Sequence, residues 1–159
     1  MRVAVLLVLA ACQSNLDATR EPVTLDRPYF DCKVQPVLTK YCGQLACHGD
    51  AGRFFRVYAR NRFRDGGDEM QREIALRGTE RDHNYAAASA FVDLAHPADS
   101  LLVQKPLEQS AGGRFHVGAT LFSRGNVFAT RDDPDYQILE QWIAGATEAP
   151  TCMEPGSNL

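Results

Sequence analysis

The sequence predicts a mostly α-helical domain. Apolar residues recur at helical spacing before a pair of central cysteines and again near the C-terminus. The C-terminal stretch also carries residues that typically begin and end a helix. No run of useful length alternates between apolar and polar residues as a half-buried strand does. The chain has 159 residues, which suits one domain, and its 45% hydrophobic content suits a globular core.

The first residues have the pattern of an export signal. One basic residue, Arg2, precedes the apolar run 3–11, which is too short to span a bilayer as a helix. The run ends at Cys12 in the tetrapeptide LAAC. This resembles the lipobox of bacterial lipoproteins, in which the signal peptide is cut before a cysteine that carries acyl chains. We therefore expect residues 1–11 to be a signal peptide and Cys12 to be the lipidation site. The alternative is an ordinary secreted protein in which Cys12 happens to fall at the cleavage site.

Residues 12–29 are expected to form a lipidated, flexible tether, because they lack helical periodicity and contain two prolines. Export would place the folded part on the periplasmic side of a bacterial membrane or at the cell surface. Gln13, which follows the cysteine, is compatible with the outer membrane by resemblance to enterobacterial sorting rules.

The first helix is expected over about 31–41 and delivers the chain to Cys42. Pro36 fits such a helix only in its first turn. The apolar positions that predict it are Phe30, Val34, Val37, Leu38 and Tyr41.

The middle of the chain predicts shorter elements. Residues 50–67 have the composition of a loop that crosses the core. A helix over 68–77, closed by Gly78, is followed by a helix over 85–95 that Asn84 would cap. A short helix over 97–103 comes next.

The C-terminal part combines an irregular segment with the best-defined helix. Residues 108–131 are rich in glycine and serine and lack periodicity, which is typical of functional or mobile segments. Asp133 then caps a helix, Pro134 takes its first position and Gly145 ends it. Its apolar stripe consists of Tyr136, Leu139, Trp142, Ile143 and Ala146.

The cysteine pattern points to chemistry. The segment from Cys42 to Cys47 is followed at once by His48, close to the C-x-x-C-H signature of covalent c-type haem but with a four-residue spacer. A longer spacer can bulge outward while the Cys-His pair keeps its geometry. Cys32 and Cys152 are then left to form a disulfide, which would close a very long loop.

Two haem-free arrangements use the same cysteines. One pairs Cys42 with Cys47 and Cys32 with Cys152 in two disulfides. The other is a zinc site made of Cys32, Cys42, Cys47 and His48, although this spacing is not that of a common zinc module.

The order of several short motifs across residues 30–147 resembles the planctomycete-type cytochrome c domains, within the class I layout. The matching stretches are 34–38, 47–49, 97–102, 105–107, 112–116, 133–136 and 142–143. This resemblance implies a cytochrome c-like helical fold over 30–152, with crossing N- and C-terminal helices and a tail at 153–159. It also implies one haem c, bound through Cys42 and Cys47 with His48 as proximal iron ligand. No Met-Pro pair stands where many cytochromes place their distal methionine.

The remaining haem contacts are assigned from their positions in the sequence. His116 is the favoured sixth ligand, because it lies downstream among glycines that allow close backbone approach. Arg53 and Arg56 are candidates to pair with the haem propionates, and Phe54 and Phe55 to wall the pocket. The other candidates for the sixth ligand are His83, His96, Met70 and Met153.

The sequence thus predicts a lipid-anchored monohaem c-type cytochrome that carries electrons to or from a redox partner protein outside the cytoplasm. The alternative is a haem-free, disulfide-stapled binding or structural lipoprotein. A sensing or peroxidase-like role with an open sixth position is a third reading. No catalytic constellation is visible, so an enzyme is not expected. A net charge of −3 gives no reason to expect nucleic-acid binding.

Overall fold

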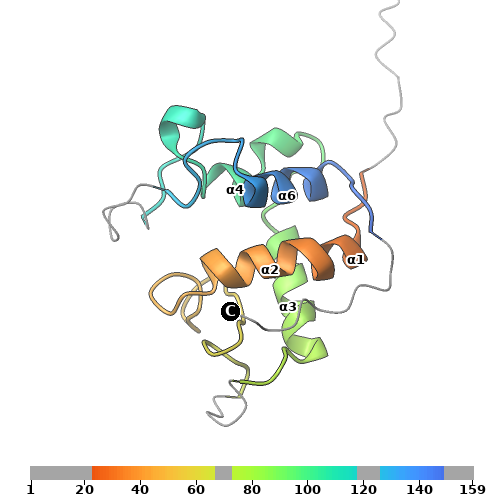
Figure 1. Cartoon of the computed structure of the whole chain (residues 1–159), viewed down its shortest axis with the longest axis vertical. Helices are drawn as coiled ribbons and strands as arrows, with labels where there is room; N and C mark the ends of the chain where they lie inside the picture. The colour runs from red at the N-terminus through yellow and green to blue at the C-terminus, as the bar shows by residue number, and fades with distance from the viewer. Residues whose placement is uncertain (1–22, 67–72, 118–125, 149–159) are drawn as a thin grey trace, which may run out of the picture.

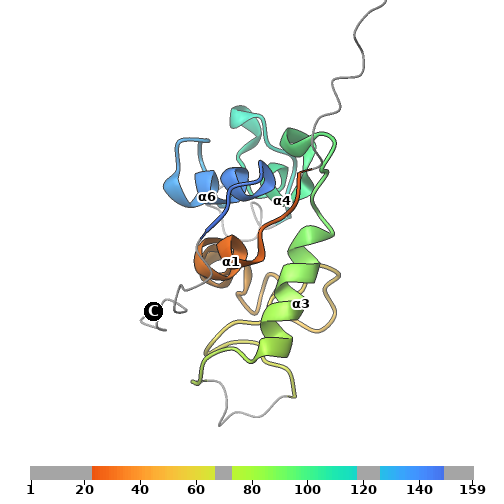
Figure 2. The same cartoon turned by 90° about the vertical axis from the view of Figure 1, so that its right-hand side faces the viewer.

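The computed structural model describes residues 23–66, 73–117 and 126–148. Helices make up 43% of these residues and none of them forms a strand, which confirms the mostly α class. An isolated parallel bridge joins Leu107 to Phe128. Helices α3 and α6 both pack on the N-terminal helical segment (Figures 1 and 2). No helix in these three ranges is both long enough and apolar enough to cross a bilayer.

One continuous helical segment runs from Arg27 to Cys42. It consists of α1 (Arg27–Tyr29), η1 (Phe30–Val34), α2 (Gln35–Val37) and η2 (Leu38–Cys42). The segment begins earlier than the predicted residue 31, because the carboxylate of Asp26 caps it by accepting from the Tyr29 N–H at 2.6 Å. The predicted tether is therefore too long at its C-terminal end, since residues 27–29 are helical.

Pro36 lies inside this segment and not in its first turn. In a regular α-helix the proline ring would collide with the carbonyl four residues earlier. The turn before the proline is wider here, because the Gln35 N–H donates to the carbonyl of Phe30, five residues back. This wider turn lets the helix continue through Pro36 to Cys42.

Helix α3 (Gly78–Ser89) differs from both helices predicted in this region. Gly78 begins it and does not close a preceding helix; residues 73–77 are not helical, and 67–72 lie outside the described residues. Asn84 is buried within α3 and does not cap it. The local start signal is Glu80, whose carboxylate accepts from the Arg77 N–H at 2.8 Å.

Glu80 also forms a buried ion pair with Arg64. The Glu80 side chain is fully buried and that of Arg64 is 2% exposed, with 2.7 Å between guanidinium nitrogen and carboxylate oxygen. The same carboxylate accepts from the Asp65 N–H at 2.9 Å. These bonds fix the loop at residues 64–65 against the start of α3, and they satisfy a charge that would be costly to bury alone.

The elements after α3 are short. The predicted helix over 97–103 is divided into η4 (Pro97–Asp99) and α4 (Leu101–Gln104). Within the predicted irregular segment 108–131, η5 (Gln109–Ala111) forms one turn, and residues 118–125 lie outside the described part.

Helix α6 (Pro134–Ile143) confirms the predicted cap and end. The Asp133 carboxylate accepts from the N–H groups of Asp135 and Tyr136, and Gly145 has a φ of 93°, which favours glycine. Hydrogen bonds at two places join this helix to the N-terminal segment. Tyr41 donates to Asp135 near one end, at 2.9 Å, and Trp142 donates to the carbonyl of residue 26 near the other, at 2.8 Å.

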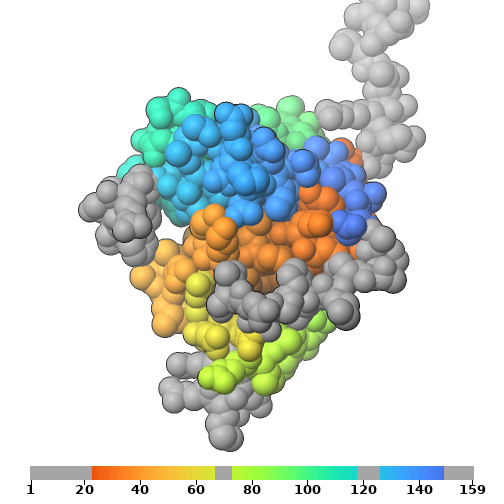
Figure 3. Space-filling view, viewed as in Figure 1, coloured from red at the N-terminus to blue at the C-terminus, as the bar shows by residue number. Residues whose placement is uncertain are grey.

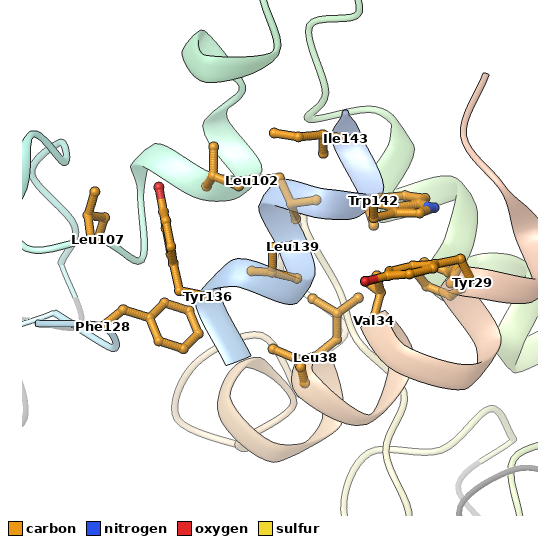
Figure 4. Packing of buried hydrophobic residues seen from close by; sticks show 14 of the residues in the cluster. Tyr29, Val34, Leu38, Leu102, Leu107, Phe128, Tyr136, Leu139, Trp142 and Ile143 are labelled. Atoms are coloured by element: carbon orange, nitrogen blue, oxygen red, sulfur yellow. The ribbon is translucent and has the colours of Figure 1, made fainter. Parts of the chain in front are cut away.

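The core lies mainly between these two helical segments. Leu139 of α6 faces Leu38 and Val34 of the N-terminal segment (Figure 4). In the space-filling view, the blue atoms of the α6 region cover the upper side of the orange N-terminal segment (Figure 3). Burial of these apolar side chains is the main stabilising contribution to the contact.

We expect Glu80→Ala to lower the free energy of unfolding by about 3–5 kcal/mol, because it leaves the buried Arg64 guanidinium without its carboxylate. The control is Arg131→Gln, which breaks a partly exposed pair with Glu140 and should cost about 0–1 kcal/mol. Denaturant titration measures both. Equal effects would contradict a structural role for the buried pair.

The same pair predicts a pH dependence. Burial by itself would raise the pKa of Glu80, but Arg64 and the N–H groups of Arg77 and Asp65 hold it below its ordinary value of 4.5. The stabilisation is therefore present above pH 4.5 and is lost as the pH falls through the lower pKa of the folded state. Below pH 4.5 the stabilities of wild type and Glu80→Ala should converge.

Candidate functional site

A cavity of about 1030 Å³ opens beside the C-terminal end of the N-terminal helical segment. This is near the upper end of the range of about 300–1,000 Å³ that is usual for small-molecule and cofactor sites. Its wall is mostly apolar. Among the described lining residues the charged ones are Arg62 and Lys105, and none is a carboxylate. The cavity therefore favours a large apolar ligand with negative charge.

The loop that follows Cys42 wraps back on itself. The His48 N–H donates to the Cys42 carbonyl at 3.1 Å, and the Cys47 N–H donates to the Gln44 carbonyl at 2.8 Å. Leu45 lies at the tip of the loop, with 61% of its side chain exposed. The spacer does not simply bulge outward as expected, because Gln44, Leu45 and Ala46 line the cavity together with Cys42, Cys47 and His48.

Glycine is required at the position after this motif. A Cβ at Gly49 would lie 2.5 Å from the Gly43 carbonyl oxygen, closer than real Cβ atoms come. A Cβ at Gly43 would lie 2.8 Å from the Cβ of Ala59, so this position is close-packed as well. The loop can close tightly behind His48 because both positions lack side chains.

His48 is held in one orientation and one tautomer. Its Nδ1 lies 2.7 Å from the carbonyl oxygen of Phe55, and since that oxygen only accepts, Nδ1 carries the proton. The Phe55 ring contacts the imidazole, with 4.8 Å between ring centroids. Burial lowers the pKa of His48 despite the bond to Phe55. The ring is therefore neutral at pH 7 with a lone pair on Nε2, as a metal-binding histidine requires.

His116 lies against His48 although the two are far apart in the sequence. The ring centroids are 5.9 Å apart and the ring planes are within 10° of parallel. Burial also lowers the pKa of His116, and the charge of Lys105 lowers it further. The structure thus brings the predicted proximal and distal residues to the same cavity, both in the neutral form.

The two motif cysteines are free thiols, not a disulfide. Burial raises the pKa of Cys42 to about 12. Burial also raises the pKa of Cys47, although Arg53 and Arg62 partly oppose this. Both side chains are therefore protonated at neutral pH.

Cys32 is disulfide-bonded, and its predicted partner Cys152 lies outside the described residues. The zinc alternative needed Cys32 as a free thiolate ligand, so that alternative is wrong. Across residues 23–66, 73–117 and 126–148, no group of three or more His, Cys, Asp or Glu side chains is placed to hold a metal ion.

The predicted pocket wall is only partly right. Phe55 lines the cavity, but Phe54 is fully exposed and does not, because the chain turns its side chain outward next to Phe55. Arg53 and Arg56 are not among the lining residues; the Arg56 guanidinium instead lies over the Tyr58 ring, 5.4 Å from its centroid.

Two cations do line the cavity, Arg62 and Lys105. Sequence reasoning included Arg62 only as one member of an arginine cluster that could pair with haem propionates, and it missed Lys105. Arg62 belongs to the arginine-rich stretch after the motif, which was a usable signal. Lys105 precedes a proline in a short helix, and nothing local distinguishes it from a surface lysine.

The other predicted ligands lie elsewhere. His83 packs edge-on against Tyr58, with 5.0 Å between ring centroids, and His96 is exposed beside Asp93. The predicted lipidation site Cys12 and the candidates Met70 and Met153 lie outside the described residues.

Comparison of the chain with protein-family models, curated proteins and solved structures found no match.

In haem-free protein we expect Cys42 to react with an alkylating reagent roughly two to three orders of magnitude more slowly in the folded than in the unfolded state, because the thiolate is the reactive form. The measurement uses a Cys47→Ser variant, so that Cys42 is the motif thiol that reacts. Equal rates in the two states would contradict the buried position. In the wild type, absence of any reactive thiol after unfolding would indicate a Cys42–Cys47 disulfide.

Proposed function

We propose that this chain is a lipid-anchored monohaem c-type cytochrome that carries single electrons outside the cytoplasm. The observation that carries the proposal is the arrangement of four side chains around one apolar cavity: Cys42, Cys47, His48 and His116.

The residues present fit a haem. Two thiols and a histidine with a free Nε2 lie on one wall, and a second neutral histidine faces them. The centroids of His48 and His116 are 5.9 Å apart. The described lining residues include no carboxylate, which also suits the two propionates of haem.

Each residue then has a defined role. Cys42 and Cys47 would hold the haem covalently, through thioether bonds to its vinyl groups. His48 would be the proximal ligand, oriented by Phe55, and His116 the distal ligand. A bound haem supplies a reversible one-electron change at iron, and two histidine ligands favour a lower potential than a His/Met pair. The wall around these side chains is mostly apolar.

The arrangement of the terminal helices supports this assignment. In the cytochrome c-like fold we propose, the first and last helices cross in contact with each other, and the first leads into the haem motif. Here α6 packs on the segment that ends at Cys42. Lipid anchoring at Cys12 and an extracytoplasmic location belong to the same proposal and depend on the lipobox-like sequence. The partner would be a redox protein in the same compartment.

The first test is an absorbance spectrum after expression in a host that matures c-type cytochromes. We expect a sharp reduced α-band that survives denaturation, because thioethers keep the haem attached. The Cys42→Ser, Cys47→Ser double variant is the control and should lose colour on denaturation. A colourless wild-type protein with no free thiols would overturn the proposal and support the haem-free, disulfide-stapled lipoprotein.

His116→Ala tests the sixth ligand. We expect the spectrum to change from six-coordinate low-spin to one with a high-spin component, because the alanine has no nitrogen to bind iron. His96→Ala is the matched control, since His96 is exposed. An unchanged spectrum in His116→Ala would rule out His116 as ligand and favour the open-position, sensing or peroxidase-like reading.

A further inference from the structure

The chain approaches α4 closely just before His116. The Arg114 N–H donates to the carbonyl oxygen of Gln104 at 2.8 Å. Gly113 makes this approach possible, because a Cβ at that position would lie 1.9 Å from the carbonyl oxygen of Leu107. The backbone is thereby fixed up to residue 114, two residues before the imidazole.

Side-chain burial does not fix the residues on either side of the histidine. Phe115 is 55% exposed and Val117 is 59% exposed. Instead, the Nζ of Lys105 donates to the carbonyl oxygen of Phe115 at 2.9 Å. That carbonyl belongs to the peptide group that joins Phe115 to His116, so the bond restrains the backbone at the histidine itself.

Lys105 is well placed to act as such a restraint because its own backbone is fixed. It ends α4, and its N–H donates to the Leu101 carbonyl at 3.1 Å. Leu102 and Val103, the residues of α4 that precede it, are buried in the same core as α6. The lysine therefore connects the loop that carries His116 to the rigid part of the protein.

We propose that Lys105 is a positioning residue that holds His116 opposite His48. The functional meaning of this role rests on the proposed function, because His116 is taken there as an iron ligand. The contact itself is a property of the chain and can be measured without haem. Lys105 acts through the backbone of the preceding residue and does not itself bind iron.

The experiment compares Lys105→Met, which keeps the length of the side chain but removes the donor, with Lys105→Arg, which restores a donor. Both are made in full-length haem-free protein, and NMR measures the nuclear Overhauser effect between the ring protons of His48 and His116. We expect a cross-peak in wild type and in Lys105→Arg, and its loss in Lys105→Met. The matched control is Lys40→Met, which removes an exposed lysine bonded to Asp135 and should keep the cross-peak.

A cross-peak that persists at full intensity in Lys105→Met would overturn the proposal. So would its loss in Lys40→Met together with Lys105→Met, since that pattern would indicate a general effect of removing a lysine. Amide spectra of each variant report whether the rest of the fold is intact.

A second readout uses the haem-loaded protein. Lys105→Met should show a larger high-spin fraction than wild type, and Lys105→Arg should return it to the wild-type level. The two proposals fail separately. If the protein carries no covalent haem, the proposed function fails, and the NMR comparison still decides the role of Lys105. If haem is attached and the Lys105→Met cross-peak and spin state match wild type, only the positioning role fails.

Discussion

Trp142 connects the two ends of the described chain. Its ring packs against that of Phe30, with 5.2 Å between centroids, and its Nε1 donates to the backbone carbonyl of Asp26 at 2.8 Å. The indole is thus fully buried with its one polar atom satisfied. This contact holds α6 against the start of the N-terminal segment. Cys42 is at the other end of that segment. The position of the cysteine motif therefore depends on a contact made at the opposite end of the helix.

A second chain of contacts leads from the core to His48. Asn84 of α3 exchanges two hydrogen bonds with the backbone of Tyr58, at 2.8 and 2.9 Å, and donates to Gln35 in the N-terminal segment at 3.1 Å. The residue before Tyr58, Val57, donates its N–H to the His48 carbonyl at 2.8 Å. A buried amide thus ties two helices to the extended stretch that supports the histidine. Both polar atoms of the Asn84 amide have partners, which offsets the cost of burying it.

The two faces of the cavity are held by different means. The face with His48 is bonded on both sides, to Phe55 and through Val57 to the core. The face with His116 is a loop on the end of a four-residue helix, between partly exposed side chains. The His48 wall is bonded through buried or half-buried groups, whereas the His116 wall is bonded through the Arg114 N–H and the Nζ of Lys105 to backbone carbonyls. This contrast follows from packing and would hold for any ligand of the cavity.

The sequence by itself determined the mostly α class, the final helix with its Asp133 cap, and the Cys-His motif, because these depend on residues a few positions apart. It also favoured His116 over His83 and His96, and His116 is the one that lies beside His48 at the cavity. Only the tertiary structure decided the start of α3, where Arg64 from a distant loop stabilises Glu80. It also decided that Asn84 bonds to Gln35 inside the core and does not cap a helix. Only the tertiary structure decided which cations line the cavity: they are Arg62 and Lys105, and not the predicted Arg53 and Arg56. Local patterns record the preferences of neighbouring residues, whereas burial of charge and the lining of a cavity depend on segments that meet only once the chain has folded.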